Sequence, residues 1–420
     1  MKKYNQQYTR MGGRYNPTYP QYPQYAPSRR KKRSRVLPLL LIILMLLVLI
    51  GHTLWQRVFV RPTLPSNDTT TEQQPLSPTD RMDAIQNGDL PPDGDTIDYG
   101  EGIRPVSDGL RKSEDFYTVL VLGRDTGGGG NTDTMLLVSY DVTNQKANVM
   151  SIPRDTMINV PWDVKKINSV YSYFGGGEKG IQQVYKEVSQ LVGFQPDFKM
   201  VVEWDAVGAI VDAIGGVWFD NPYPMDYHDP KQDLVIEQEQ GYRLLTGEDA
   251  MQVIRWRAND NDSPYGYRKR NGGIGDDGRI KLQQSFLKAL FRQMLTIQNV
   301  RNINKIAKVF SETVDTDLTL QNMLWFLQKA FMGGLGMEDV EFFTMPYYGV
   351  SVWSRSYNQN LSYVCPQSSK LLEIVNTKLS PFVKEFELSD LDIMSVRSNG
   401  TLRSSTGYVE DREATKVRQN

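Results

Sequence analysis

The sequence predicts an α/β domain, an α-β-α sandwich with a mixed central sheet, and one transmembrane helix before it. Two observations predict the domain: apolar runs typical of buried strands alternate with segments whose apolar residues recur at helical spacing. A third observation is the almost wholly apolar run at 36–55, which has about the 20 residues that a membrane-spanning helix needs. The folded domain is expected at 115–384.

Strands account for the first part of this domain. The run 117–122 is apolar except for Thr118 and stops at Gly123-Arg124-Asp125, which predicts a strand buried on both faces. Further strands are expected at 135–140 and 147–152, with the turn between them at 141–146. Shorter strands are expected later in the chain, at 200–202, 217–219 and 340–344.

Helices alternate with the later strands. From Glu178 to Gly193 the apolar residues recur at helical spacing, and Gly193 suits the C-cap. Another helix should begin after Thr246, with Asp249 as its capping-box partner. The remaining helices are expected at 205–214, 277–297, 302–314, 318–331 and 368–379.

Four segments outside the domain are distinguished by composition. Residues 1–35 contain no acid and end in a basic cluster, which predicts a disordered Tyr-rich cytoplasmic tail. That cluster flanks the apolar run at 36–55, so the positive-inside rule places the domain outside the cytoplasm on a single-pass anchor in the cell membrane. A cleaved signal peptide is the alternative, although no small-x-small cleavage site follows the run. A flexible stalk is expected at 56–114 and a polar tail at 385–420.

Charge and composition exclude several classes of protein. Lys and Arg total 48 against 49 Asp and Glu, a net charge of -1, so no nucleic-acid partner is expected. Cys365 is the single cysteine, which excludes an internal disulfide and a thiolate metal cage. The two histidines, His52 and His228, are too few for a His-based zinc site or triad. Chemistry must therefore rest on carboxylates, Arg, Lys and hydroxyls.

Two carboxylates stand near strand ends, where α/β domains place ligand groups. Asp125 follows the first strand and Asp133 precedes the second. Oxygen ligands without His or Cys favour Mg²⁺ or a similar hard ion, and turn capping is the alternative role for such residues. The glycines at 127–130 lack the Gly-Lys-Ser/Thr of a phosphate loop, so a flexible loop is expected there.

Cations follow the ends of several predicted elements. Arg154 comes just after an apolar strand, Lys166 lies in a Lys-Ile-Asn string, and Arg255 and Arg257 end a helix. Each one alone is typical of a surface ion pair. Together they can converge on phosphate, because the guanidinium fork binds two oxygens at once.

The start of the long helix at 277–297 carries a further polar group. Arg279 and Gln283 are four residues apart and share one helical face, close to the positive end of the helix dipole. A bound anion would offset the unfavourable position of Arg279. A solvated Arg in a surface turn is the alternative.

The order of these motifs resembles that of the LytR-CpsA-Psr family, over nearly the whole folded domain. Ser-Ile-Pro-Arg-Asp-Thr at 151–156 is the specific string, and the other strings count mainly through their order. A short cytoplasmic tail with one membrane helix is similar to that family as well. The other strings are Leu-Gly-Arg-Asp at 122–125, Thr-Asp-Thr at 132–134, Lys-Ile-Asn at 166–168, Arg-x-Arg at 255–257 and Asp-x-Gly-Arg-x-x-x-Gln-Gln at 276–284.

Members of that family attach anionic glycopolymers, such as wall teichoic acid or capsule, to peptidoglycan from a polyprenyl-pyrophosphate carrier. The resemblance implies a phosphotransferase in which a sugar hydroxyl of peptidoglycan is the nucleophile. It also implies that Asp125 and Asp133 hold Mg²⁺ or Mn²⁺, that Asp276 orients arginines, and that an apolar channel takes the prenyl chain. The residues implied to bind the pyrophosphate are Arg154, Lys166, Arg255, Arg257, Arg279 and Gln283.

Three features depart from the family pattern. Asn131 and Leu282 stand where the family often has Arg, which removes positive charge from the rim of the site. The segment 258–275 is longer and richer in Asn and Gly than usual, which suggests a lid on the acceptor side. Two other functions stay open: a lipid-pyrophosphate hydrolase that uses the same site, and a non-catalytic membrane-anchored regulator or scaffold.

Overall fold

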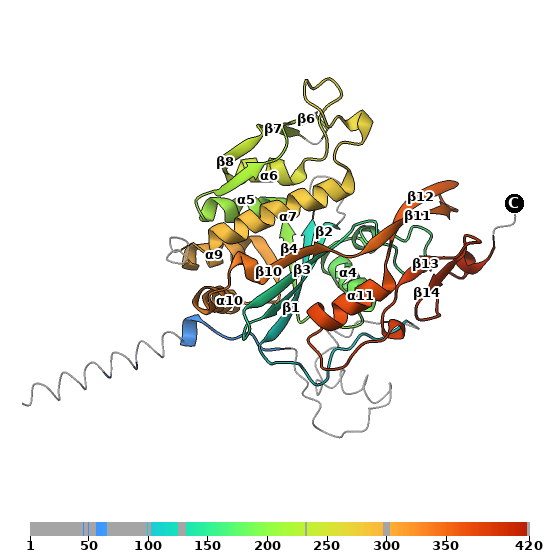
Figure 1. Cartoon of the computed structure of the whole chain (residues 1–420), viewed down its shortest axis with the longest axis horizontal. Coiled ribbons are helices and arrows are strands. Elements are labelled where there is room, and N and C mark those ends of the chain that lie inside the picture. Colours follow the sequence, from blue (N-terminus) through green and yellow to red (C-terminus); the bar gives the residue numbers. More distant parts are fainter. Residues whose placement is uncertain are drawn as a thin grey trace, which may run out of the picture. The chain divides into compact units, whose positions relative to one another are not determined.

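The computed structural model describes residues 45, 49, 56–64, 99, 102–124, 132–231, 233–296 and 303–417 (Figure 1). The predicted cytoplasmic tail, nearly all of the predicted transmembrane helix, Asp125, the glycines at 127–130 and Asn131 lie outside these residues. Within the described ranges, none of the helices combines the length and hydropathy that a bilayer crossing requires. The chain divides into the units 1–54 and 55–420, and every element named below belongs to the second.

A six-stranded mixed sheet forms the centre of this unit, as the sequence predicts. Strands β1, β2 and β3 form an antiparallel meander, to which β4 and β10 add in parallel on either side. In spatial order the strands are β10 (Val340–Thr344), β3 (Lys146–Ile152), β2 (Thr132–Asp141), β1 (Phe116–Arg124), β4 (Phe198–Glu203) and β9 (Val314–Thr316).

The register of the meander decides where the strand ends meet. Arg124 at the end of β1 pairs with Thr132 at the start of β2, and Met135 pairs with Ile152 at the end of β3. The end of β1, the start of β2 and the end of β3 therefore lie at one edge of the sheet. This edge brings together polar residues that follow or precede the three strands.

Helices pack on both faces of the sheet, which confirms the predicted α/β class. On one face, α4 (Gly177–Val192) and α11 (Ser368–Ile374) bury apolar side chains against Leu120, Leu137 and Met150. On the other face, α7 (Gly275–Met294) and α10 (Leu320–Gly333) pack against residues that include Leu136 and Val149. Because side chains alternate between faces, a strand covered on both sides needs a continuous apolar run.

Two helix ends follow the local signals in the sequence. The helix α4 ends at Gly193, whose φ of 80° is left-handed. The helix α6 (Gly247–Arg255) begins at Thr246, whose hydroxyl accepts from the Asp249 amide at 3.2 Å while the Asp249 carboxylate accepts from the Thr246 amide at 3.0 Å. This capping box fixes the start of the helix that ends at the Arg255-Trp256-Arg257 string.

The described residues also form four two-stranded sheets, and the sequence pattern predicted only one of their strands, β5 (Val217–Asn221). Several of these short strands, such as β5 and β7, alternate more and less exposed residues, so they contain no long apolar run. The helices α5 (Trp204–Ala213) and α9 (Ile303–Thr313) pack beside them. The other strands are β8 (Gly241–Leu245), β6 (Met225–Asp229), β7 (Leu234–Gln238), β11 (Tyr347–Ser354), β12 (Gln359–Pro366), β13 (Met394–Val396) and β14 (Leu402–Ser404).

The segment 385–417, expected as a polar tail, is instead folded. Leu391 and Met394 are fully buried, β13 pairs with β14, and a buried hydrogen bond of 2.9 Å joins Asn159 to Asp392. The segment contains few large apolar residues, but most of them point into the core. The low apolar content of the segment therefore gave no indication that it folds.

Parts of the predicted stalk also pack on the domain. Arg111 forms a buried ion pair with Asp197 at 2.8 Å, and Arg61 donates to the Tyr117 hydroxyl at 2.9 Å. These contacts depend on single polar side chains rather than on apolar runs, so periodicity could not predict them.

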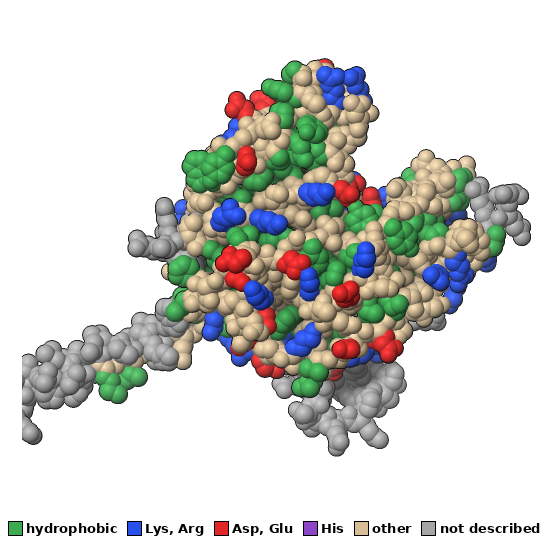
Figure 2. All heavy atoms as spheres, in the orientation of Figure 1, with side chains coloured by type: hydrophobic (Ala, Val, Ile, Leu, Met, Phe, Trp, Pro, Cys, Tyr) green, Lys and Arg blue, Asp and Glu red, His purple; other side chains and the backbone are tan. Residues whose placement is uncertain are grey.

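Charged side chains of both signs are interspersed over the face shown in Figure 2, in agreement with the net charge of -1. The same view shows a hollow between the lobe that carries β6, β7 and β8 and the β11–β12 hairpin. The N-terminal end of α7 lies beside this hairpin, because Tyr347 of β11 donates a hydrogen bond to Asp277.

Candidate functional site

Two carboxylates and three guanidinium groups form a cluster at the sheet edge where β2 begins and β3 ends. The Oδ1 atom of Asp133 accepts from Arg154 at 3.1 Å, and its Oδ2 atom accepts from Arg257 at 2.9 Å. Asp276, in the first turn of α7, lies 3.1 Å from Arg154 and 3.5 Å from Arg279. The two carboxylates thus hold three arginines from separate parts of the chain close together.

Each member of this cluster is positioned by the end of a regular element. Asp133 is the second residue of β2, and Arg154 comes two residues after β3. Arg257 comes two residues after α6, while Asp276 and Arg279 belong to the first turns of α7. Rigid elements therefore set the spacing of the charges, which suits recognition of a ligand with fixed geometry.

The electrostatics of the cluster are those of an anion site. Arg279 is only 3% exposed, and burial together with the neighbouring Arg257 and Arg154 lowers its pKa to about 10. For Arg154, burial lowers the pKa, but Asp276 and Asp133 outweigh that effect and raise it. Three cations face two carboxylates, so the cluster carries an excess of positive charge.

Unused hydrogen-bond donors support the same conclusion. Within the described residues, the buried Nε atoms of Arg154 and Arg279 have no hydrogen-bond partner. A buried donor without an acceptor costs about 1–3 kcal/mol, and the Nε atoms of Arg111, Arg124 and Arg268, outside the cluster, lack a partner among the described residues as well. An anion that accepts from the guanidinium groups of Arg154 and Arg279 would remove that cost.

A polar cleft of about 610 Å³ opens beside the cluster. Arg255 and Gln283 line it as well, and the Gln283 side chain is held by a hydrogen bond of 3.3 Å to the carbonyl of Ile254. Seven residues named from the sequence therefore line one cleft: Asp133, Arg154, Arg255, Arg257, Asp276, Arg279 and Gln283.

A narrower cavity of about 50 Å³ adjoins this cleft and runs between α7 and the sheet. Its apolar lining includes Leu136, Ile280 and Leu287, and it shares Arg154 and Arg279 with the polar cleft. Deeper apolar residues of the same layer include Phe291 and Phe342, which are only partly buried. The charged cluster thus shares this small cavity with apolar residues of α7 and the sheet.

One predicted site residue, Lys166, lies apart from the cleft. Lys166 lines neither cavity: its ammonium group pairs with Asp155 at 3.0 Å and lies 5.6 Å from the centroid of the Tyr363 ring. Asp125, one of the two predicted metal ligands, lies outside the described residues. The structure therefore gives a position for only one carboxylate of the predicted pair.

The described residues contain one of the two predicted metal ligands, Asp133. Across the described ranges, no three His, Cys, Asp or Glu side chains gather closely enough to hold a metal on their own. Mg²⁺ does not need such a group, because it is usually bound by one or two carboxylates, waters and substrate phosphates. Both oxygens of Asp133 accept hydrogen bonds from guanidinium groups, so a metal ion bound there would compete with Arg154 and Arg257.

Several residues of the cleft escaped the sequence analysis. Lys269 and Tyr227 line the outer wall and contact each other, with the ammonium group 5.6 Å from the ring centroid. Leu282, where the family often has Arg, is 2% exposed and belongs to the apolar core. No motif marks Lys269, which supplies a cation from the segment 258–275 instead.

Polar contacts hold the segment 258–275 in place. The buried amide of Asn259 donates to the carbonyls of Pro224 and Gly266 at 3.0 and 2.9 Å. Its oxygen accepts from the Trp256 indole at 2.9 Å. The segment expected as a lid is thus tied to the lobe and forms part of the cleft wall.

Comparison with known proteins agrees with the motif order. A sequence model of the LytR_cpsA_psr family matches residues 95–379. The Bacillus subtilis polyisoprenyl-teichoic acid--peptidoglycan teichoic acid transferase TagV is 28% identical over 226 residues, which are 52% of this chain and 53% of that protein. The Staphylococcus aureus regulatory protein MsrR is 26% identical over 239 residues, 56% of this chain and 66% of that protein. The matches thus cover less than two thirds of these relatives.

The fold is similar to a solved structure as well. The crystal structure of B. subtilis TagV matches with a TM-score of 0.50 at 25% identity, over 63% of this chain and 96% of that structure. The family match spans more than half of the chain and contains every motif on which the predicted resemblance depends. This protein belongs to the LytR-CpsA-Psr family.

Proposed function

We propose that this protein transfers an anionic glycopolymer, of the teichoic acid or capsule type, from a polyprenyl-pyrophosphate carrier to a sugar hydroxyl of peptidoglycan. The observation that carries the proposal is the excess of guanidinium groups around Asp133 and Asp276, with the Arg279 side chain almost wholly buried. The name of the relative TagV supports the class of polymer and acceptor.

The two cavities match the two chemical parts of such a carrier. The polar cleft offers arginines to a pyrophosphate, and guanidinium forks bind phosphate oxygens in pairs. The narrow cavity beside it has charged residues of the cluster in its lining, and its apolar part, formed by α7 and the sheet, suits a prenyl chain. The cavity is narrow, so the chain would have to displace partly buried side chains such as Leu287 and Phe291.

The cluster can also stabilise the transition state. In the proposed reaction, the acceptor oxygen forms a bond to the phosphorus nearest the polymer. The bond between that phosphorus and the bridging oxygen of the pyrophosphate breaks. Negative charge then grows on the departing polyprenyl phosphate, and Arg154, Arg257 and Arg279 are fixed where they can neutralise it. Mg²⁺ or Mn²⁺ held by Asp125 and Asp133 would supply further neutralisation of the phosphate charge.

The predicted anchor gives this proposal its location. A single membrane helix at 36–55, with the N-terminus in the cytoplasm, would keep the domain beside the outer membrane surface. There a polyprenyl carrier exposes its pyrophosphate. Peptidoglycan lies on the same side, so donor and acceptor would both be within reach.

The proposal is tested with the full chain in detergent micelles, a polyprenyl-pyrophosphoryl oligosaccharide, peptidoglycan and Mg²⁺. The expected product is oligosaccharide bound to peptidoglycan, absent with Arg154→Ala and present with Arg292→Ala, a change at an exposed position of α7. Release of free sugar phosphate without wall-linked product would show a hydrolase instead. If Arg154→Ala fully complemented a deletion strain while a chain without residues 1–35 did not, the protein would be a scaffold.

A further inference from the structure

The β11–β12 hairpin and the segment 394–417 enclose a second cleft of about 850 Å³, here called the C-terminal cleft. Much of its wall comes from residues after 379, where the match to the family ends. The cleft is therefore built in large part by an addition to the family domain. The residues that line the C-terminal cleft therefore indicate which class of ligand it can bind.

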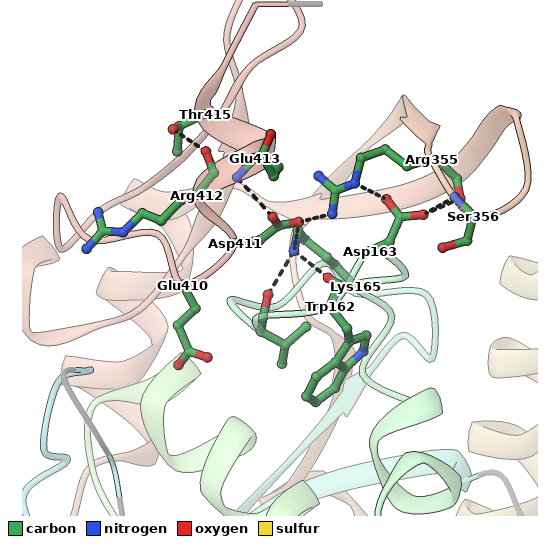
Figure 3. Close-up of polar contacts among 12 residues, drawn as sticks. Trp162, Asp163, Lys165, Arg355, Ser356, Glu410, Asp411, Arg412, Glu413 and Thr415 are labelled. Atoms are coloured by element: carbon green, nitrogen blue, oxygen red, sulfur yellow. Dashed lines mark hydrogen bonds and ion pairs between the residues drawn. The ribbon is translucent and has the colours of Figure 1, made fainter.

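A buried ion network makes the base of this cleft rigid (Figure 3). The ammonium group of Lys165, whose side chain is 3% exposed, pairs with Asp411 at 3.0 Å and donates to the carbonyls of Val160 and Trp162 at 2.8 and 2.7 Å. Arg355 pairs with the same Asp411 at 2.7 Å. The network thus joins the hairpin, the loop after β3 and the C-terminal segment.

A second carboxylate fixes the tip of the hairpin to the same base. Asp163 lies 3.6 Å from Arg355, and it accepts from the Ser354 hydroxyl at 2.5 Å and the Ser356 amide at 2.9 Å (Figure 3). Because all three segments are held by buried or partly buried polar contacts, the cleft is preformed. A preformed cleft binds a ligand without the cost of ordering its walls.

The charges that line the C-terminal cleft balance. The cations are Lys165, Arg355 and Lys416, and the carboxylates are Asp163, Asp411 and Glu413. Each of these cations is already paired with one of these carboxylates; Lys416 lies 2.5 Å from Glu413. The cluster of Asp133, Asp276 and three arginines, here called the arginine cluster, has more cations than carboxylates. The lining of the C-terminal cleft has no such excess, which disfavours an anionic ligand.

The remaining lining combines an aromatic ring with amide groups. Trp353 of β11 stands opposite Asn360 of β12 in the strand register. Across the cleft, the Asn399 oxygen accepts from the amide and hydroxyl of Thr401 at 3.1 and 2.7 Å, which leaves its NH₂ group to donate to a ligand. A flat ring with a few placed amides suits a sugar, whose ring has an apolar C–H face and hydroxyls at its rim.

We propose that the C-terminal cleft binds a neutral oligosaccharide, the chemical class of a peptidoglycan glycan backbone. The volume of about 850 Å³ is within the range of about 300–1,000 Å³ that small-molecule sites occupy. Trp353 stacks on a sugar ring, while Asn360 and Asn399 bind its hydroxyl or acetamido groups.

The position of the C-terminal cleft relates it to the arginine cluster. Tyr363 lines the cleft, and its ring also faces Lys166, whose partner Asp155 lines the narrow cavity at the cluster. The two sites are therefore linked through neighbouring side chains. A glycan held here would be an acceptor strand near the transfer site; that role, unlike the binding itself, rests on the proposed function.

The binding is tested with the full chain in detergent micelles and an uncharged tetramer of N-acetylglucosamine. Affinity is measured by saturation-transfer NMR and by isothermal titration. Trp353→Ala and Asn360→Ala are each expected to weaken binding about tenfold, the scale of one lost aromatic contact or hydrogen bond. The matched control is Trp218→Ala, because Trp218 is 48% exposed and lies in a different two-stranded sheet.

The outcomes separate this proposal from the transferase proposal. Arg154→Ala is expected to bind the tetramer like the wild type, even if it abolishes transfer. No binding by the wild type, or equal binding by Trp353→Ala and Asn360→Ala when circular dichroism shows both folded, overturns the sugar site. Tighter, salt-sensitive binding of poly(glycerol phosphate) in the same cleft overturns the assignment to a neutral ligand.

Discussion

The Asp133 carboxylate lies 3.1 Å from the Arg154 guanidinium, although the rest of β2, the turn and all of β3 separate them in the chain. The antiparallel register places both at one sheet edge, and the second Asp133 oxygen holds Arg257 at 2.9 Å. One carboxylate thus fixes two cations, which would otherwise repel each other. This arrangement determines how the arginines can meet a pyrophosphate.

Replacing the central carboxylate should separate binding from turnover. In Asp133→Asn the two arginines lose their shared anion, so we expect turnover to fall at least about 100-fold through lost positioning. The apparent affinity for inorganic pyrophosphate should not fall, because one negative charge has left the site. Steady-state kinetics and calorimetric titration measure the two effects. An equal loss in both would contradict the role given to Asp133.

The same variant tests the proposed metal. If Asp133 is a ligand, Asp133→Asn should raise the Mg²⁺ concentration for half-maximal transfer by about 10–100-fold, the usual cost of damage to a metal site. Asp315→Asn is the control, since Asp315 is exposed in β9. An unchanged Mg²⁺ requirement would remove Asp133 from the metal site.

We expect the burial of Arg279 to lower the free energy of unfolding, a cost that its function requires. Its Nε atom has no hydrogen-bond partner within the described residues, and burial and two neighbouring arginines lower its pKa to about 10. Its partner Asp276 is half exposed and can be solvated, so we expect Arg279→Met to leave the free energy of unfolding unchanged or to raise it, while transfer is lost. Urea unfolding and the transfer assay provide the comparison. A clear loss of stability would assign Arg279 a structural role.

The cap of α6 should contribute to stability in the expected way. Thr246→Ala removes the hydroxyl that accepts from the Asp249 amide, so we expect a loss of about 1 kcal/mol in the free energy of unfolding. Thr246→Ser retains the acceptor and should cost much less. Urea unfolding of both variants decides whether the capping box stabilises the helix.

Glu187 should make the fold sensitive to pH. Burial raises its pKa from 4.5 to about 8, and Glu410 and Asp392 act in the same direction, while Lys186 opposes them. The folded state therefore keeps a proton that the unfolded state loses above pH 4.5. Its contribution to stability is complete below about pH 4.5 and falls as the pH rises towards about 8.

Glu187→Gln removes this dependence because glutamine stays neutral. The variant should melt close to the wild type at pH 5 and be more stable by roughly 1–3 kcal/mol at pH 8. Glu338→Gln, at an exposed position, is the control. Thermal melts at the two pH values that show the same difference between variant and wild type would contradict a neutral Glu187.

The sequence predicted the central sheet well because its strands are covered on both faces. Such strands need nearly continuous apolar runs, as in 119–122, and these are easy to recognise. The β11–β12 hairpin has one open face, and the segment 385–417 depends on a few buried side chains and on ion pairs such as Lys165 with Asp411. Neither leaves a periodic apolar signal.

Those site residues that lie at the ends of helices and strands could be predicted from the sequence. Asp133 lies at the start of β2, Arg154 and Arg257 follow β3 and α6, and the order of their motifs indicated the family. Lys269 and Trp353 line clefts that only tertiary packing creates. A single Lys or Trp in a loop or a short strand gives no local sign of such a role.

Native mass spectrometry of the full chain, purified in a mild detergent, tests most directly whether the arginine cluster binds the carrier. The wild type should retain a polyprenyl phosphate or pyrophosphate that copurifies with it. The lipid should be lost in Arg154→Ala and kept in the exposed control Arg292→Ala. A wild type free of such lipid, or an Arg154→Ala variant that retains it fully, would contradict the assignment of this cluster to a lipid-linked pyrophosphate.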